Sequence, residues 1–367
     1  MSIAFPRSRR GGKPRDGASM TPFVSVIMPV RNEVAHIAAT LDPLLHQCYD
    51  PCRYEILVID GQSTDATADI VRELQLTNPQ LQLLDNPKRL ASAARNIGVQ
   101  QARGDYLVIV DGHCEIRSKH YLRDLVRAFE EHSVDCLGRP QPLDVAGAAP
   151  LQKAIAVARA SRLGHNPGSH IYSKSGGPVK PQSVGVAYRK ELFERVGLFD
   201  ETFDACEDVE FNHRVDAAGF RCHLAPELAI HYLPRDTLGG LAHQMQRYGR
   251  GRVRLITKHP TTFSLLPLIP ALFLVGIFGS FFLGLTSPIF ASLFCVCAIV
   301  YMATVAGAGL WLALKRRAAE AAPLIPIVFL TIHVGAGYGV LAESMPRVSN
   351  WLIRHARPIL RRTNRLT

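Results

Sequence analysis

Three uncharged stretches in the last third of the chain limit its fold more than any other feature. No Asp, Glu, Lys or Arg occurs in residues 263–285, 288–314 or 323–342, and each stretch reaches the roughly 20 residues that a helix needs to span a bilayer. The third has a lower helix propensity because it contains prolines, glycines and a histidine. We therefore predict a membrane region over residues 262–342, with two spans and a weaker third segment.

Basic residues beside these stretches predict their orientation. The segment "RYGRGRVRLITKH" (residues 247–259) precedes the first stretch, and residues 315–317 (Lys-Arg-Arg) follow the second. Because short loops rich in Lys and Arg stay in the cytoplasm, we expect a multi-pass protein of the inner (plasma) membrane with its N-terminal domain in the cytoplasm. A third span would place the Arg-rich tail, residues 343–367, outside. Either residues 323–342 span the membrane and the tail is an exception to the positive-inside rule, or residues 323–342 form a re-entrant or interfacial segment.

Charge and cysteine usage narrow the class of protein further. The formal net charge of +11 suits a polyanionic partner, an anionic membrane surface or a phosphate-bearing ligand. Residues 1–20 are basic and lack an apolar core, which predicts a disordered basic arm and not a signal peptide. The eight cysteines form no CxxC pair, which argues against a zinc module and favours a reducing compartment.

Before the membrane region, apolar strand patterns alternate with helical patterns. Strands are predicted over residues 23–29, 54–60, 81–85 and 105–111, with helices over 34–45, 64–74 and 91–102. Near-continuous apolar strands that alternate with helices indicate a mostly parallel sheet with helices on both faces. We expect this α/β domain to occupy residues 21–258.

Polar side chains collect where these strands end, which is where open α/β sheets bind ligands. They are Pro29, Asn32 and Glu33 after the first strand, Asp60 and Asp65 after the second, and Asp111 and His113 after the fourth. Neither GxGxxG nor a P-loop is present, which disfavours dinucleotide and Walker-type binding. Asn32 and Ser63 or Thr64 could instead be helix N-caps, with Glu33 and Asp65 complementing the helix dipole. Asp60 and Asp111 end apolar strands, where an unpaired charge is costly, so each requires a donor or a cation.

Four segments occur in an order that resembles family 2 glycosyltransferases. They are "VSVIMPVRNE", "EILVIDGQSTDATADIV", "SAARNIGVQQARGDYLVIVDGH" and "VGLFDETFDACEDVEFNHRVDAAGF". The resemblance covers about residues 23–248 and is greatest to the membrane-associated glucosyltransferases of succinoglycan-type exopolysaccharide assembly. It implies a GT-A fold that binds a nucleotide-diphosphosugar, followed by C-terminal transmembrane helices.

The resemblance also implies roles for individual residues on the donor side. Pro29, Asn32 and Glu33 would line the nucleotide pocket, Asp60 would face the uracil of a UDP-sugar, Asp65 would lie near that pocket, and Arg89, Arg95 and Asn96 would bracket the nucleotide or its phosphates. Asp111 to His113 occupies the DxD position, where acidic groups hold Mn²⁺ or Mg²⁺. A histidine replaces the second carboxylate, and imidazole can also ligate Mn²⁺. His231 would be a further phosphate or metal contact, or equally a satisfied core histidine.

On the acceptor side, Glu207 and Asp208 match the ED motif of the family. Asp208 would be the general base that inverting transfer needs, and Glu207 would orient the acceptor or the base. Acids in a first helical turn are also common without any such role. Gln244, Arg247 and Tyr248 fit the QxxRW pattern with Tyr for Trp, and Arg250, Arg252 and Arg254 would face anionic lipid. Residues 164–181 are interpreted as a loop over the acceptor site.

Together these features predict a membrane-anchored, inverting enzyme. It would move one hexose, expected to be glucose, from a UDP-sugar to a lipid-linked glycan acceptor in exopolysaccharide or cell-surface glycan synthesis. Membrane lipids and other polysaccharide-assembly proteins are the expected partners, and no nucleic acid is. The alternatives are a processive polysaccharide synthase, a polyprenyl-phosphate glycosyltransferase, and an inactive scaffold of a glycan export complex.

Overall fold

A computed structural model describes residues 21–363 except 144–146 and 166–167, with side chains described as far as Arg347. The predicted basic arm, residues 1–20, and the side chains of the tail beyond Arg347 lie outside this part. The strands are β1 Val24–Val30, β2 Tyr54–Asp60, β3 Leu81–Asp85, β4 Tyr106–Ile109, β5 Cys114–Glu115, β6 Cys136–Gly138, β7 Gly177–Val179, β8 Gly185–Arg189, β9 Cys222–Leu224 and β10 His231–Tyr232. The α-helices are α1 Ile37–Leu45, α2 Thr67–Gln75, α3 Ala91–Gln101, α4 Tyr121–His132, α5 Pro150–Arg159, α6 Glu191–Val196, α7 Glu207–Ala217, α8 Leu238–Lys258, α9 Ile269–Gly284, α10 Pro288–Arg316 and α11 Ile325–Thr363.

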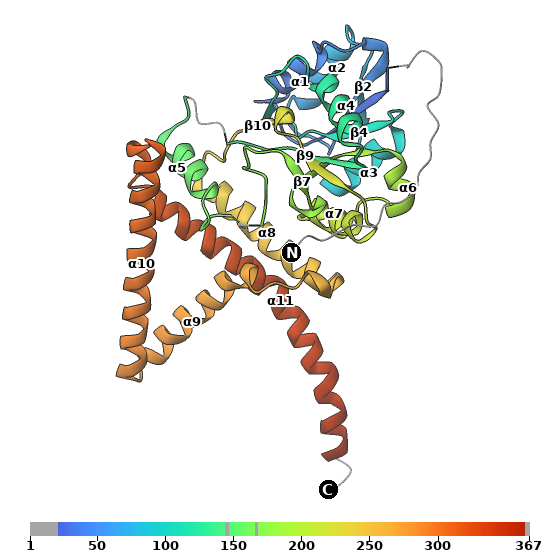
Figure 1. Ribbon diagram of the computed structural model, residues 1–367. Helices are drawn as coiled ribbons and strands as arrows, with labels where there is room; N and C mark the ends of the chain where they lie inside the picture. The colour runs from blue at the N-terminus through green and yellow to red at the C-terminus, as the bar shows by residue number, and fades with distance from the viewer. Residues whose placement is uncertain (1–20, 144–146, 166–167, 364–367) are drawn as a thin grey trace, which may run out of the picture.

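One mixed sheet organises the N-terminal domain, with strand order β3-β2-β1-β4-β8-β6-β9-β7 (Figure 1). Its first half is parallel, as the sequence predicts, and Val30 at the end of β1 is in register with Asp60 at the end of β2. β8 then runs antiparallel to both β4 and β6. β5 and β10 form a separate two-stranded ribbon beyond the end of β4.

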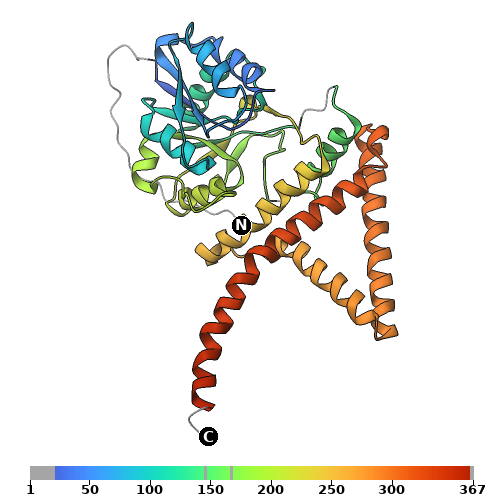
Figure 2. The same ribbon diagram turned by 180° about the vertical axis from the view of Figure 1, so that it is seen from behind.

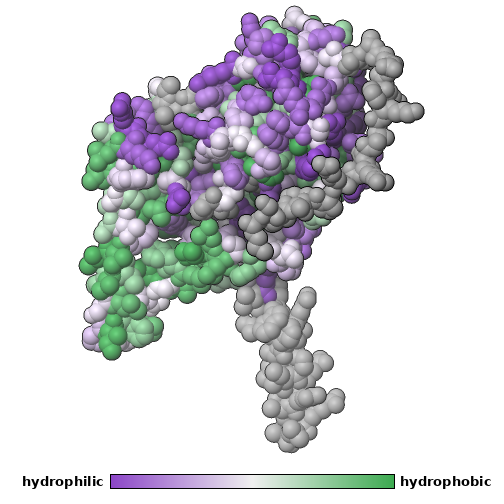
Figure 3. Space-filling model, in the orientation of Figure 1, coloured by the Kyte–Doolittle hydropathy of each residue, from purple (hydrophilic) through white to green (hydrophobic). Residues whose placement is uncertain are grey.

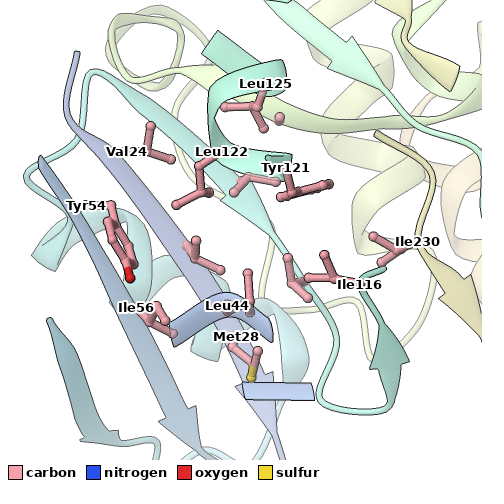
Figure 4. Packing of buried hydrophobic residues seen from close by; sticks show 14 of the residues in the cluster. Val24, Met28, Leu44, Tyr54, Ile56, Ile116, Tyr121, Leu122, Leu125 and Ile230 are labelled. Atoms are coloured by element: carbon pink, nitrogen blue, oxygen red, sulfur yellow. The ribbon is translucent and has the colours of Figure 1, made fainter. Parts of the chain in front are cut away.

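Helices cover both faces of this sheet, which confirms the predicted layering. Along β1, Val24, Val26 and Met28 face one core and Ile27 faces the other, because successive residues of a strand point to opposite faces. On the first face, residues of α1 and α4 pack on the strands (Figure 4). On the second face the strands meet residues of α3, α6 and α7. The helix that carries the ED motif is therefore fixed directly to the sheet.

After the sheet domain, the structure contains three helices long and apolar enough to cross a membrane. They are Leu266–Gly284, Pro288–Arg316 and Ile325–Arg347. In Figures 1 and 2, α9, α10 and α11 form three sides of a triangle beside the sheet domain. The first two are covered little by the rest of the protein, whereas 44% of the third is buried. Figure 3 shows the apolar surface of α9 and α10 exposed on one side of the molecule.

α11 differs from α9 and α10 because it packs along α8, the polar helix that precedes the membrane region. A Cβ on Gly339 would lie 2.2 Å from the carbonyl oxygen of Gln246, and one on Gly249 would lie 2.3 Å from that of Ala336. These approaches are too close for any side chain, so the glycines allow the two backbones to touch. Later residues of α11 meet later residues of α8, so the helices run parallel.

Candidate active site

The loops after β1 and β2 are tied together at one edge of the sheet. Asn32, at φ +56°, accepts a hydrogen bond from the backbone N–H of Thr64 through Oδ1 (2.8 Å). Its own N–H donates to Ser63 Oγ (2.8 Å). The buried carboxylate of Asp60 accepts from the N–H of Ser63 (3.0 Å) and from its hydroxyl. Asn32 and Asp60 thus share one hydrogen-bonded loop pair, with Pro29 partly buried beside it in β1.

Asp65 stabilises this loop pair as a capping residue. Its carboxylate accepts from the N–H of Thr67 at the start of α2 (3.0 Å), from the Thr67 hydroxyl, and from the N–H of Val34 (3.2 Å). These hydrogen bonds, that of the Thr67 side chain foremost, lower the pKa of Asp65. Asp65 therefore has partners within the protein at the start of α2, beyond the helix-dipole role considered from the sequence.

His113 is held between two residues and does not face open solvent. Its Nδ1 lies 2.8 Å from Oε1 of Glu33, and its Nε2 lies 3.1 Å from the hydroxyl of Tyr232 on β10. Burial acts to lower the pKa of His113, but the hydrogen bond to Glu33 and the charges of Asp111 and Glu33 outweigh it, so the pKa is raised. The DxD-like segment is thereby connected to β1 on one side and to the β5–β10 ribbon on the other.

The donor set at this edge fits a divalent cation only in part. The partly buried carboxylate of Asp111 follows β4 and is available to a ligand, whereas Glu33 and Tyr232 already engage both ring nitrogens of His113. Among the residues that the structure describes, no group of three or more His, Cys, Asp or Glu is arranged to hold a metal. Asp111 is therefore the residue of this segment that would hold a cation. His113 fits a supporting position.

His231 lies on β10, opposite Glu115 of β5. Its neighbour Tyr232 contacts His113. Because successive strand residues point to opposite faces, His231 points away from that contact. Tyr232, which no sequence motif indicated, is the residue of β10 that contacts His113, and the phosphate or metal role of His231 stays a prediction.

A buried ion pair connects α3 to the ED motif. Nη1 of Arg95 lies 2.9 Å from Oε1 of Glu207, and both side chains are almost fully buried. Burial acts to lower the pKa of Arg95, but the charges of Glu207, Asp208 and Asp111 outweigh it and raise that pKa. Neither Nη1 nor Nε of Arg95 makes a well-directed hydrogen bond within the described residues. The guanidinium is thus a buried cation whose charge is balanced by Glu207, Asp208 and Asp111.

Glu207 and Asp208 occupy the first turn of α7 and differ in environment. Glu207 is buried, and burial raises the pKa of its carboxyl group against the opposing effect of Arg95. Asp208 is exposed and accepts a hydrogen bond from the N–H of Val209. An exposed carboxylate next to a buried, ion-paired one matches the roles predicted for a base and its neighbour.

Two of the residues predicted to bracket the nucleotide or its phosphates have hydrogen-bond partners within the protein. The amide of Asn96 is buried: Nδ2 donates to the carbonyl of Phe199 (2.9 Å) and to Glu201 (2.9 Å), and Oδ1 accepts from the N–H of Phe199 (2.8 Å). Because all its polar atoms are used within the protein, Asn96 positions the loop before α7 and has none left for a nucleotide. Arg89 is exposed, and its Nε donates to Gln62 in the loop after β2 (2.8 Å).

The QxxRY segment, on α8, lies between α7 and the membrane region. Gln244 accepts a hydrogen bond from Nη1 of Arg159 on α5 (2.9 Å) and donates to the Tyr248 hydroxyl (3.3 Å). Arg247 donates to the carbonyl of Asp204, in the loop that leads into α7. α8 therefore contacts the loop before the ED motif on one side and α5 on the other. Arg159 was missed in the sequence, where it is a lone cation in the apolar segment "AIAVARA".

Arg254 corrects the lipid-facing role expected for it. Its Nη1 lies 2.6 Å from Oδ1 of Asp204, and its Nε lies 3.0 Å from Oε1 of Glu343 on α11. A guanidinium that is ion-paired on both sides is not free to attract anionic lipid. Arg254 instead fixes α8 to α11 and to the loop before α7.

The comparisons with known proteins agree with this fold and site. The profile of Glycosyl transferase family 2 matches residues 25–197, and that of Glycosyl transferase family group 2 matches residues 116–312. The structure resembles that of the mannosyltransferase PcManGT from Pyrobaculum calidifontis, with a TM-score of 0.55 over 88% of this chain and 90% of that one, at 22% identity. A mixed sheet with carboxylates at its strand ends and at the start of α7 thus defines a glycosyltransferase of the GT-A class.

Sequence relatives place the chain within that class. The succinoglycan biosynthesis protein ExoA of Rhizobium meliloti (strain 1021) is 31% identical over 320 residues, which cover 87% of this chain and 94% of the relative. A dolichyl N-acetyl-α-D-glucosaminyl phosphate 3-β-D-2,3-diacetamido-2,3-dideoxy-β-D-glucuronosyltransferase of Methanococcus voltae is 28% identical over 72% of this chain and 82% of the relative. The chain belongs to glycosyltransferase family 2.

Proposed function

We propose that the protein is a membrane-anchored, inverting hexosyltransferase that uses a UDP-sugar, expected to be UDP-glucose, and a lipid-linked glycan acceptor. The observation that carries this proposal is the arrangement at the start of α7. The exposed carboxylate of Asp208 adjoins the buried Glu207–Arg95 pair. The charge of Asp111, at the end of β4, acts on the same guanidinium. A base and a phosphate-binding edge are therefore within reach of one small substrate.

The residues of this site divide the chemistry between them. Asp208 takes the proton of the acceptor hydroxyl while the oxygen of that hydroxyl bonds to the anomeric carbon of the donor sugar. The bond from that carbon to the diphosphate breaks in the same step. A cation held by Asp111 would supply Lewis-acid stabilisation of the departing diphosphate. Arg95 would contribute charged donors to the same diphosphate. The loop pair of Asn32 and Asp60 would hold the nucleoside.

The acceptor class is inferred from the relatives and from the membrane region. One relative is named for succinoglycan biosynthesis, and another for transfer to a dolichyl-linked sugar phosphate. The solved mannosyltransferase carries GDP-Man and Mn²⁺, which supports a nucleotide-sugar donor with a divalent cation. A catalytic domain anchored to the bilayer meets a lipid-linked acceptor at high effective concentration.

We assign residues 21–258 to the catalytic domain and residues 262–342 to the membrane region, in which α9 and α10 span the bilayer and α11 lies along the interface. α11 packs lengthwise on the polar helix α8, and Figure 1 shows it running across the open end of the α9–α10 hairpin. Its exposed apolar residues form one stripe: Ile327, Leu330, Val334, Tyr338 and Met345. This arrangement keeps the basic tail on the cytoplasmic side and satisfies the charge rule.

The proposal is tested by measuring transfer from labelled UDP-glucose to lipid extracts that contain the acceptor. Wild type and Asp208→Asn are compared with and without added Mn²⁺. We expect transfer of a single sugar that depends on the cation and falls by about 10²- to 10⁴-fold in the variant. A ladder of products would favour a processive synthase instead. No transfer from any UDP-hexose would favour the scaffold.

A further inference from the structure

Arg159 is a buried cation whose surroundings contain tyrosines in place of carboxylates. Its side chain is 7% exposed at the end of α5, and Nε has no hydrogen-bond partner among the described residues. Nη1 donates to Gln244, and the guanidinium lies 5.8 Å from the ring centroid of Tyr248. Burial acts to lower the pKa of Arg159, but Tyr172, Tyr248 and Tyr232 outweigh it and raise that pKa. A buried charge without a partner is costly, so this cluster favours an anionic ligand.

A second guanidinium adds to the positive charge of this cluster. Burial, together with the charges of Arg159 and Arg252, lowers the pKa of His165 to about 4, so both arginines stand close to a ring that is neutral at physiological pH. The same charge of Arg252 acts on Cys206, the residue before Glu207. Gly251, the neighbour of Arg252 on α8, packs against Ala205 and Cys206, so Arg252 follows the point where α8 meets the segment before α7. Phosphate groups are the ligands that paired arginines bind with bidentate geometry.

The cluster lies where the catalytic domain meets the membrane helices. Val157 and Ala158 of α5 pack in one apolar core with Leu312 of α10 and Phe329 of α11. The carbonyl of Leu163, in the loop that follows α5, accepts a hydrogen bond from Nε2 of His333 on α11 (2.9 Å). A headgroup at the bilayer surface would therefore reach Arg159 from the membrane side.

α8 connects the cluster to the catalytic residues over a short distance. Gln244 and Tyr248 contact Arg159, and Gly251 packs against Ala205 and Cys206, just before the ED motif. From Gln244 to Gly251 the helix advances about 10 Å, which is the scale of a short saccharide. An acceptor with its anion at Arg159 could thus present a sugar hydroxyl to Asp208.

We propose that Arg159 and Arg252, with Gln244 and the tyrosines 172, 232 and 248, bind the diphosphate that joins the acceptor glycan to its lipid. This inference rests on the proposed function, because it specifies the acceptor site of that reaction. It gives α5 and Tyr172 a role in acceptor recognition. This site adjoins the donor edge, because Tyr232 also lies 3.1 Å from Nε2 of His113. The UDP-sugar donor also carries a diphosphate, so the experiment must distinguish binding of the acceptor diphosphate from binding of the donor diphosphate.

Binding to the full chain in nanodiscs of phosphatidylcholine tests this site, with farnesyl diphosphate, farnesol and UDP as separate probes. We expect Arg159→Gln to weaken farnesyl diphosphate binding by at least about tenfold, since a charge-assisted hydrogen bond is lost, and to change UDP binding by less than about twofold. Arg252→Gln should act in the same direction. Arg162→Gln, which removes an exposed charge from the same segment, is the matched control and should change neither.

The other outcomes overturn the inference in distinct ways. If Arg159→Gln weakened UDP binding as much as farnesyl diphosphate binding, Arg159 would be assigned to the donor diphosphate. Equal competition by phosphatidylglycerol would assign the cluster to lipid headgroups in general. Unchanged farnesyl diphosphate binding in variants that elute and melt as folded protein would make Arg159 structural. Arg252→Gln, at a half-buried position, keeps the test valid if Arg159→Gln fails to fold. Since binding requires no turnover, an enzyme that transfers sugar but fails this test loses only the diphosphate site.

Discussion

Nη1 of Arg95 lies 2.9 Å from Oε1 of Glu207, and this buried ion pair joins α3, which packs on the parallel half of the sheet, to the helix that presents Asp208. Arg95 also stands near the charge of Asp111, at the end of β4. The charges of the proposed diphosphate edge and of the proposed base therefore both act on one guanidinium. The Arg95–Glu207 pair is one of the contacts that fix α7, and with it Asp208, against the sheet domain.

Removal of one partner of this pair should cost both stability and activity. Arg95→Met leaves the carboxyl group of Glu207 buried without its cation, so we expect the free energy of unfolding to fall by about 3–5 kcal/mol. The double variant Arg95→Met/Glu207→Gln should regain much of that stability but no transfer activity. Thermal unfolding and transfer rates measured on the same preparations check this.

The control for that experiment is Lys88→Met, which breaks the more exposed pair between Lys88 and Glu201. Exposed pairs contribute about 0–1 kcal/mol, so this variant should melt close to wild type and keep its activity. If Arg95→Met melted like Lys88→Met, the buried pair would not be what holds α7 in place.

Restoring a second carboxylate at the DxD position should weaken the enzyme. In His113→Asp the new carboxylate would face Oε1 of Glu33, now 2.8 Å from the imidazole, and two carboxylates at such a distance cannot both ionise. We expect kcat/KM to fall by at least about tenfold. Glu33→Gln/His113→Asp should recover part of the loss because it removes the repulsion.

Titration of activity with Mn²⁺ distinguishes the two views of His113. A supporting residue predicts that His113→Asp lowers activity at every concentration of the cation. Higher activity than wild type, or a lower requirement for Mn²⁺, would show instead that His113 occupies a ligand position and that a carboxylate serves better there.

The parallel half of the sheet and its helices were predictable because they depend on local patterns. Short apolar runs such as Tyr54–Asp60 are buried as central strands of a sheet. The location of Asn32, Asp60 and Asp111 at strand ends follows from their position directly after such runs. The antiparallel half was not foreseen. Strands such as Cys136–Gly138 are short, and the contacts across the sheet from β8 determine their position.

The residues whose surroundings differ from the expectation share a physical cause, which is a partner far away in the sequence. Asn96 is satisfied by Phe199, 103 residues later, and Arg254 by Glu343, 89 residues later. The sequence offers no periodicity that links such pairs. Arg159 and Tyr232 were missed for the same reason, since their meaning depends on α8 and on the loop that holds His113.

Gly339 on α11 should tolerate no side chain. A Cβ there would lie 2.2 Å from the carbonyl oxygen of Gln246, a backbone atom that cannot move aside. We expect Gly339→Ala to destabilise the protein by about 1–3 kcal/mol through overpacking and to lower activity, because Gln246 belongs to the QxxRY segment. Gly307→Ala is the matched control, since a Cβ on this α10 residue would meet nothing within 4 Å. Equal melting of the two variants would refute the close packing of α8 on α11.

The interfacial position proposed for α11 predicts that both ends of the membrane region lie on the cytoplasmic side. A green fluorescent protein fused after Thr367 should be fluorescent, and an alkaline phosphatase at the same site should be inactive. A cysteine introduced at Thr286, between α9 and α10, should react with an impermeant maleimide from outside, whereas Arg317→Cys should not. An active phosphatase fusion would mean that α11 spans the bilayer and that the charge rule fails for this tail.

A cluster at the end of α8 should make the stability of the protein depend on acid pH. Burial acts to raise the pKa of Asp200, but hydrogen bonds from Lys258 and Thr202 outweigh it and lower the pKa to about 2. Glu210 on α7 is fully buried, and despite that burial Arg214, Lys258 and His259 lower its pKa as well. Because the folded-state pKa values lie below those of the unfolded chain, this stabilisation is complete above the unfolded values. It is lost as the pH falls from about 4 towards 2.

Lys258→Met tests that dependence. It removes the ammonium group that both carboxylates share, so the variant should melt at a lower temperature near pH 7 and lose less of its Tm than wild type between about pH 5 and about pH 3. Lys153→Met breaks a pair with the half-exposed Glu320 and should leave the pH dependence unchanged. The cluster joins α7 to the end of α8, so its loss should also loosen the hold on Asp208. If Lys258→Met kept the full acid sensitivity of wild type, other carboxylates would be responsible and the α7–α8 junction would have to be stable without this lysine.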